Sequence, residues 1–369
     1  NCLKHNVMKW WKDFDPKKGN ISRAIATCYV CDSKVPADQT RKLFQEGKSS
    51  ERLIVTITSV KKSAGKFFSV PSNKEIKQFQ TSSDYLRKKI KSKANLIPDE
   101  LISRVPVSFG VINVWIYGIK SWGELFNDRQ KLMLITFISN LKKAYDLMLK
   151  NDYDEEYAKV LATYLGLNID RLVAYGSRMG YWDSTREKIS PAMTRQAMGM
   201  IFDYVENNPF SISFSWNTNM KWILRVLEHC LEIKQVKNSP NVIVSNFSAT
   251  KLPYSNNFFD AVITDPPYYD NIPYSYLSDF FYVWLKRSVG FLYPELFSTP
   301  LTPKTEEIVA YQQKDNVSGK DYFENLLSKS FLEINRVLKS DGISIIVYAH
   351  KSTDGWETLI NSLLKSSLV

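Results

Sequence analysis

The fold class of this chain is indicated most clearly by one stretch, Phe258-Phe259-Asp260-Ala261-Val262-Ile263-Thr264-Asp265-Pro266-Pro267-Tyr268-Tyr269. It begins with a short apolar run, which is typical of a buried β-strand. The Asp-Pro-Pro step then ends the run, because proline fixes φ and removes the backbone N–H that a strand would donate. We therefore predict a strand over 258–263 that ends in a stiff turn carrying a carboxylate and two phenol rings.

The sequence around this stretch alternates short strands with helices from about residue 218 onward. We expect helices at 220–233, 276–287 and 323–338, and further strands at 242–244 and 343–348. Such alternation predicts an α/β region built on a parallel, doubly wound sheet. The last residues, 359–369, continue a helical pattern without a terminating signal, and the chain opens on Asn1. We therefore expect a fragment cut at both ends.

The sequence before residue 218 divides into two further regions. Residues 101–217 are mainly helical by their apolar periodicity, with helices expected at 127–149, 157–172 and 192–205. Residues 1–100 predict a small, turn-rich module that contains a hairpin of 52–60 with 67–70 and a basic helix or linker at 84–93. We thus expect three regions, 1–100, 101–217 and 218–369.

The positive charge is concentrated in the first part of the chain. Residues 1–150 hold 28 Lys+Arg and 13 Asp+Glu, which leaves 49 − 28 = 21 against 38 − 13 = 25 for the remainder. This asymmetry predicts contact with a polyanion such as DNA, and a solvated basic surface is the alternative. Apolar runs are far shorter than the roughly 20 residues of a membrane helix, so we expect a globular protein without membrane contact. The sequence shows no leader pattern and its four cysteines have no dense, even spacing, so we expect a cytoplasmic location.

The Asp265-Pro266-Pro267-Tyr268 turn has the groups needed to hold an aromatic amine. The Asp265 carboxylate and the Pro266 carbonyl can accept its two hydrogens, and the prolines fix the direction of that carbonyl. Tyr268 offers a face on which a flipped base stacks, and Tyr269 extends it. The structural alternative is a proline-stiffened turn whose Asp caps a helix.

Other candidate residues follow from the rule that ligands bind beyond the carboxyl ends of parallel strands. The strand at 342–348 delivers His350 and Lys351 to the same sheet edge as Asp265, where they are candidates for holding a cofactor or a phosphate. Ser278 and Asp279 follow the motif and are candidates to line the same crevice. The glycines of 176–180 lie in a helical context and are rejected as a cofactor loop.

The chain resembles the adenine-specific DNA methylases that contain a zinc ribbon, within the amino-methyltransferases. The resemblance rests on Asp260 to Asn271, Ser278 to Arg287, Leu292 to Phe297 and Ala349 to Glu357. It implies a partial Rossmann-like S-adenosylmethionine-dependent methyltransferase sheet, a helical insertion and an N-terminal module with a zinc ribbon and a β-hairpin. The implied reaction is methyl transfer to N6 of adenine flipped out of double-stranded DNA, with Asp265 also beside the cofactor.

The chain departs from the pattern of this family on the cofactor side. The glycine-rich loop of the family has no counterpart here, and Phe247-Ser248-Ala249 stands where Gly-Asp-Ala is usual. Ser248 is therefore the remaining candidate for contact with the adenosyl group. We expect weakened cofactor binding by these residues alone.

The cysteines predict half of a metal site. Cys28 and Cys31 have knuckle spacing for Zn²⁺. Cys2 and His5 repeat that spacing, with 22 residues between the two pairs, which suits a Cys₃His ribbon. A redox pair is the alternative, disfavoured because no thioredoxin-like context surrounds it. We interpret Cys230 as a core residue.

Two other functions stay open at this point. The same four residues can grip another exocyclic amine, such as cytosine N4 in DNA or guanine N2 in RNA. A non-catalytic nucleic-acid-binding subunit is the alternative outside the enzymes. No motif identifies a protein partner, for example from a restriction or defence system.

Overall fold

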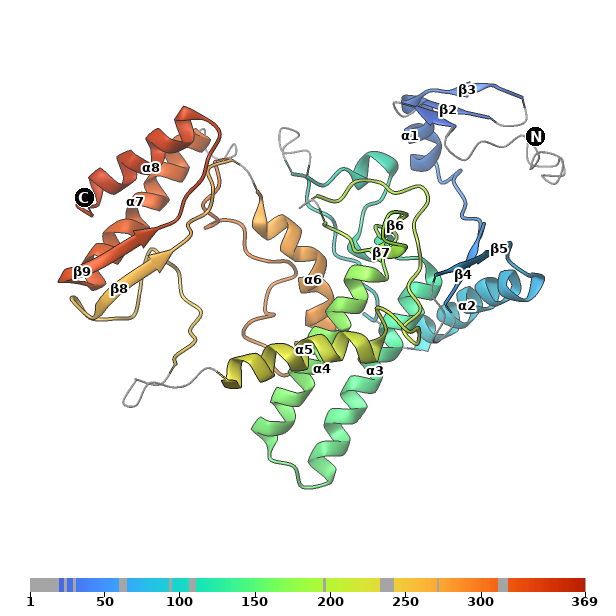
Figure 1. Cartoon of the computed structure of the whole chain (residues 1–369), viewed down its shortest axis with the longest axis horizontal. Helices are drawn as coiled ribbons and strands as arrows, with labels where there is room; N and C mark the ends of the chain where they lie inside the picture. The colour runs from blue at the N-terminus through green and yellow to red at the C-terminus, as the bar shows by residue number, and fades with distance from the viewer. Residues whose placement is uncertain are drawn as a thin grey trace.

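The computed structural model of the chain describes residues 20–22, 25–28, 31–59, 65–92, 95–105, 111–194, 197–232, 242–270, 272–310 and 318–368. It is a mixed α/β structure with several small sheets. Figure 1 shows a helical body in the middle, with β8, β9, α7 and α8 at one end and β1 to β5 with α2 at the other. No helix of the described residues is long and apolar enough to cross a membrane.

The front of the chain forms two small antiparallel sheets and two helices. Their bounds are β1 Ile21–Ser22, β2 Ile25–Thr27, β3 Lys34–Val35, α1 Ala37–Gln45, β4 Thr56–Thr58, β5 Phe67–Ser69 and α2 Asn73–Ser92. Strands β4 and β5 pair with Ile57 opposite Phe68, so the predicted hairpin is confirmed. The basic stretch is confirmed as helical, because it forms the last part of α2.

The middle of the chain is built on long helices. Its elements are η4 Val114–Tyr117, η5 Trp122–Leu125, α3 Asp128–Lys150, α4 Glu155–Tyr175, β6 Tyr181–Asp183, β7 Lys188–Ser190 and α5 Trp216–Glu232. Asn127 caps α3 as predicted: its side chain accepts from the Gln130 N–H, and the Gln130 side chain accepts from the Asn127 N–H, both at 2.9 Å. Such reciprocal capping fixes where the helix begins.

Two predictions for this region are wrong. The described residues of 192–205 form turns and irregular backbone, because Met198 pairs with residues 111–113 and Val205 donates to the Gly180 carbonyl. Cys230 is exposed and not a core residue. It lies near the end of α5, where the helix leaves the body and Leu231 is 84% exposed.

The larger hydrophobic core lies where α3, α4 and α6 (Tyr274–Ser288) meet. Phe280 and Trp284 of α6 are fully buried, and both rings pack on Phe126, at 5.9 and 5.1 Å between centroids. The core therefore crosses residue 217, where the sequence predicts a boundary. The helix that follows the Asp265 motif belongs to the helical body.

The C-terminal part is a smaller α/β unit. Strands β8 (Phe259–Thr264) and β9 (Leu338–Ile346) form a two-stranded parallel sheet, which α7 (Gly319–Val337) and α8 (Thr353–Lys365) accompany. The predicted strand at 242–244 is wrong, since these residues are in no strand and their side chains are 76 to 93% exposed. The helical pattern predicted for 359–369 ends at Lys365, with Ser366 as its cap.

The two faces of this small sheet have different surroundings. Val262, Ile346 and Tyr348 pack against the second core of Phe323, Leu327, Phe331, Ile334 and Leu359 from α7 and α8. Ile263 and Ile343, which point to the opposite face, are 72% and 64% exposed. Period-two alternation thus places one covered and one open face on the same strands.

Candidate active site at the end of strand β8

Strand β8 delivers the Asp265 motif to the edge of the sheet. The ladder continues one step past β9, since Val347 donates to the Thr264 carbonyl at 2.9 Å. Asp265 is exposed directly after this point, whereas Pro266 is buried. The rigid part of the turn is therefore held by packing while its carboxylate faces solvent.

Tyr268 is tied to the carboxylate that precedes it. A side-chain hydrogen bond to Asp265 raises the pKa of Tyr268, with smaller contributions from burial and from the Asp265 charge. The Tyr268 hydroxyl therefore stays protonated and donates. The ring meets Tyr348 edge to face at 5.3 Å. Tyr268 both orients the carboxylate and keeps a ring close to it.

His350 lies at this edge as predicted, but both of its ring nitrogens are engaged. Nε2 lies 3.2 Å from Asp270 Oδ1, and Nδ1 accepts from the Ser352 backbone N–H at 3.1 Å and from its hydroxyl at 2.9 Å. Because Nδ1 accepts, these hydrogen bonds assign the proton of the neutral ring to Nε2, which donates to Asp270. The side chain is 4% exposed. In this arrangement His350 positions the loop and is not directed at a ligand.

Tyr269 points into the protein. Its ring contacts Phe323 at 5.3 Å and His350 at 5.7 Å, and its carbonyl accepts from the Ala310 N–H at 2.8 Å. Burial raises the pKa of its hydroxyl. Of the two neighbouring tyrosines, only Tyr268 has its ring beside Asp265, so stacking on a base falls to Tyr268.

The remaining cofactor candidates do not join this cluster. Among the described residues, the Ser248 hydroxyl bonds only locally, to the hydroxyl and backbone N–H of Thr250. Lys351 is exposed on the loop before α8. Gly176 ends helix α4, in agreement with its rejection as part of a cofactor loop. The described residues at this edge therefore do not form a complete site for S-adenosylmethionine.

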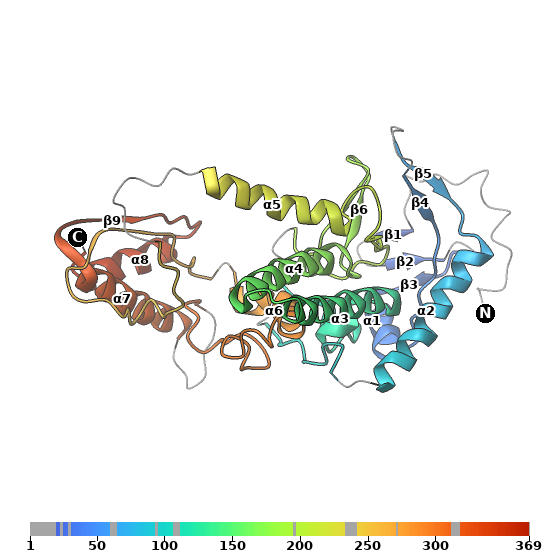
Figure 2. The ribbon, with the colours of Figure 1, turned by 90° about the horizontal axis from the view of Figure 1, so that it is seen from below.

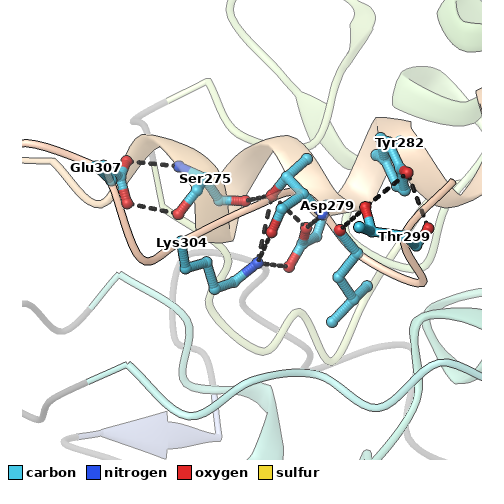
Figure 3. A network of polar contacts seen from close by, with 8 residues as sticks. Ser275, Asp279, Tyr282, Thr299, Lys304 and Glu307 are labelled. Carbon is cyan, nitrogen blue, oxygen red and sulfur yellow. Dashed lines mark hydrogen bonds and ion pairs between the residues drawn. The ribbon is translucent and has the colours of Figure 1, made fainter. Parts of the chain in front are cut away.

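A strap of residues 299–310 fixes the helix that follows the motif (Figure 3). Glu307 accepts from the Ser275 backbone N–H at 2.7 Å, which satisfies a free donor at the start of α6. Asp279 is fully buried and bonded to the Thr302 N–H at 2.9 Å and to Lys304 Nζ at 2.8 Å. Asp279 is thus a structural residue, not a lining of the crevice, and Ser278 is exposed.

Sequence reasoning missed the residues that support the motif. Thr302, Lys304 and Glu307 lie on an irregular strap whose sequence has no periodic pattern. Only Tyr348, the aromatic residue at the end of a predicted strand, gave a signal. Their supporting role follows only from the tertiary structure, which places them beside α6 and β8.

The described residues around Cys28 and Cys31 are joined by local hydrogen bonds. The Cys28 N–H donates to the Ser33 carbonyl and the Asp32 N–H donates to the Cys28 carbonyl, both at 2.9 Å, while Cys31 Sγ lies 3.2 Å from the Ser33 hydroxyl. Within the described ranges no three His, Cys, Asp or Glu side chains gather as a metal site would require. Cys2 and His5 lie outside the described residues, so the zinc ribbon stays a prediction.

Comparison of the chain with protein-family models, with curated proteins and with solved structures found no match.

Proposed function

We propose that this chain forms the amine-binding part of a methyltransferase that transfers a methyl group from S-adenosylmethionine to N6 of adenine in DNA. One observation carries the proposal. An exposed carboxylate, Asp265, stands at the carboxyl end of a parallel strand, with a buried proline after it and the phenol of Tyr268 beside it. Ligands of parallel α/β sheets bind at this kind of edge.

The chemistry of the amine explains why these groups are needed. The lone pair of the adenine amino group is delocalised into the ring, so the nitrogen is a poor nucleophile. Asp265 and the Pro266 carbonyl accept its two hydrogens and hold the nitrogen in the geometry for attack. S-adenosylmethionine supplies an electrophilic methyl group when bound. Asp265 also lies where it can take the proton that the methylated nitrogen releases.

Tyr268 has two tasks in this proposal. Its hydroxyl holds one oxygen of Asp265, and the carboxylate keeps other lone pairs for the substrate amine. Its ring stacks on the flipped adenine, a contact worth roughly 1 to 3 kcal/mol per base. Tyr348, 5.3 Å from that ring, supports it from behind.

The residues expected to hold S-adenosylmethionine do not form a complete binding site in this chain. Ser248 bonds to Thr250 and the nitrogens of His350 are engaged, so the described residues do not fit the whole cofactor. No step is therefore assigned to cofactor contacts of this chain. The zinc ribbon, double-stranded DNA as substrate and a cytoplasmic location belong to the same proposal.

The experiment measures transfer of labelled methyl from S-adenosylmethionine to double-stranded DNA by the full-length protein. Asp265→Asn and Asp265→Ala are expected to lower the rate about 100- to 1000-fold, the usual loss when one transition-state hydrogen-bond partner is removed. Asp260→Asn is the matched control, because Asp260 is an exposed carboxylate on the same strand. Equal rates for the Asp265 and Asp260 variants contradict the assignment.

Analysis of the product separates the rival functions. If the label is recovered as N4-methylcytosine, or as N2-methylguanine in RNA, the target of the enzyme is that amine and not the amine of adenine. The incomplete cofactor side favours a second candidate, a non-catalytic nucleic-acid-binding subunit. It predicts no transfer by any variant, together with salt-sensitive DNA binding that Asp265→Ala leaves unchanged.

A further inference from the structure

A strongly basic surface lies far from the Asp265 site. It consists of the β4–β5 hairpin and helix α2, and we call it the ribbon–helix surface. The described residues 52–59 and 65–92 hold 8 Lys+Arg and 2 Asp+Glu, so this surface carries a net charge of 8 − 2 = +6. Figures 1 and 2 both show the hairpin and α2 at the opposite end of the molecule from β8.

Helix α2 presents several of its cations on one side. Lys74, Lys77, Tyr85 and Lys88 are exposed and follow the three- and four-residue spacing of one helical face. From Lys74 to Lys91 this face is about 26 Å long at 1.5 Å per residue. It borders an open hollow of about 490 Å³ between α2 and the start of α3. The other side of α2 is anchored, since Leu86 is 2% exposed in the larger core.

The hairpin presents aromatic side chains that no core covers. Phe67 and Phe68 on β5 are 55% and 54% exposed, and Val70 is 70% exposed. Within the described residues, the Phe68 ring contacts Trp182 edge to face at 5.9 Å. A two-stranded hairpin has little stability of its own, so solvent-exposed phenylalanines here are costly unless they serve binding.

We infer that the ribbon–helix surface binds duplex DNA, with the β4–β5 ribbon in the major groove and the cationic face of α2 along the phosphates. The inference deepens the proposed function, on which its choice of DNA as the ligand rests. The major groove of B-form DNA admits a two-stranded ribbon, and phenylalanine makes apolar contact with thymine methyl groups there. Lysines spaced along a helix supply contacts to the phosphates.

Two other polyanions fit the same geometry less well. The deep, narrow major groove of A-form RNA does not accept side chains in this way. A helix that lies on a membrane inserts a wide apolar face, whereas the free face of α2 carries cations, the carboxylate of Asp84, amides and hydroxyls. The charge and the ribbon together therefore favour B-form DNA.

The test measures binding of a fluorescent B-form duplex at several salt concentrations. In Lys74→Gln/Lys77→Gln, the slope of log affinity against log salt is expected to fall by about 2, since each lost phosphate contact lowers it by about 1. In Phe67→Ala, affinity is expected to fall about tenfold with the slope unchanged, because an apolar base contact releases no counterions. A change in the salt slope therefore reports on the lysines of α2, and a change in affinity at constant slope reports on the hairpin.

Matched controls come from other exposed parts of the chain. Lys143→Gln/Lys150→Gln removes two exposed cations from α3, and Phe210→Ala removes a ring that is 83% exposed. Both are expected to bind DNA like the unaltered protein. If either control loses as much as its test variant, the ribbon–helix surface is not the DNA site. Equal or stronger binding to an A-form RNA duplex or to anionic vesicles also overturns the inference.

Asp265→Ala separates this inference from the proposed function. Its slope of log affinity against log salt is expected to stay unchanged, because a carboxylate makes no phosphate contact that releases counterions. If DNA binding depends on Lys74, Lys77 and Phe67 but no methyl transfer is found, the methyltransferase proposal is refuted and the DNA-binding role of the ribbon–helix surface is supported. If the ribbon–helix variants transfer methyl groups at the unaltered rate, the DNA-binding role of this surface is refuted and the methyltransferase proposal is kept.

Discussion

The helical body and the β8–β9 unit differ in how completely their apolar surfaces are covered. In the body, α3, α4 and α6 bury rings such as Phe126, Phe280 and Trp284 on all sides. In the β8–β9 unit, one sheet face packs on α7 and α8 while Ile263 and Ile343 stay exposed on the other. Parallel sheets are usually covered on both faces, so this unit has the less complete packing.

The candidate site lies between these two regions. Strand β8 and Tyr269 belong to the smaller core, whereas α6, which begins at Tyr274, belongs to the body. The strap joins both, because Glu307 bonds to Ser275 and Ala310 bonds to Tyr269. The position of Asp265 relative to α6 therefore depends on tertiary contacts from both sides, and four predictions test this comparison.

The largest expected effect on stability comes from Lys304→Met. This change leaves the fully buried Asp279 carboxylate without its cation, which is expected to cost about 3 to 5 kcal/mol of unfolding free energy. Chemical denaturation measures the loss. Adding Asp279→Asn to this variant is expected to recover part of it, and no recovery would show that the ion pair is not the cause.

A smaller effect is expected from Gly355→Ala. An added Cβ would lie 2.3 Å from His350 Nδ1, so the ring must move away from Ser352 and Asp270. Overpacking of this kind costs about 1 to 3 kcal/mol. Thermal unfolding measures the cost, and Gly199→Ala is the control, because its Cβ meets nothing within 4 Å. Similar losses in both variants would contradict close packing at His350.

The loop before β8 is expected to loosen in acid. Hydrogen bonds from Arg336, and then from the Leu252 N–H, lower the pKa of Glu333 from its ordinary 4.5 to about 2. A lowered folded-state pKa adds stability that is present above about 4.5 and is lost as the pH falls toward 2. Unfolding free energies measured across this window should fall more for the unaltered chain than for Glu333→Gln. Parallel curves would refute the role of Glu333.

The smallest effect is expected from Ile263→Ser on the open sheet face. The side chain is 72% exposed, so the unfolding free energy should change by no more than about 0.5 kcal/mol. Phe331→Ala, on the covered side, is the contrast, with an expected loss of about 3 to 5 kcal/mol. A large loss for Ile263→Ser in solution would mean that this face is covered after all.

Local sequence patterns predicted most individual elements. The strand before Asp265, the capped helix after Asn127 and the hairpin at the front are all confirmed. The predicted helix over 192–205 is wrong because Met198 pairs with a distant segment. The predicted strand over 242–244 is wrong because no described strand pairs with it. A complete doubly wound sheet and a zinc ribbon stay predictions.

The sequence by itself determined the elements and the chemistry of the motif, because strand and helix periodicity and proline geometry act over a few neighbouring residues. Only the tertiary structure decided what surrounds the motif. It placed the Tyr269 ring against Phe323 of the second core and gave both nitrogens of His350 hydrogen-bond partners. It also buried Asp279, which binds Lys304 of the strap. Apart from the contact of His350 Nδ1 with Ser352, these outcomes depend on contacts between residues 25 to 80 positions apart, for which no local pattern exists.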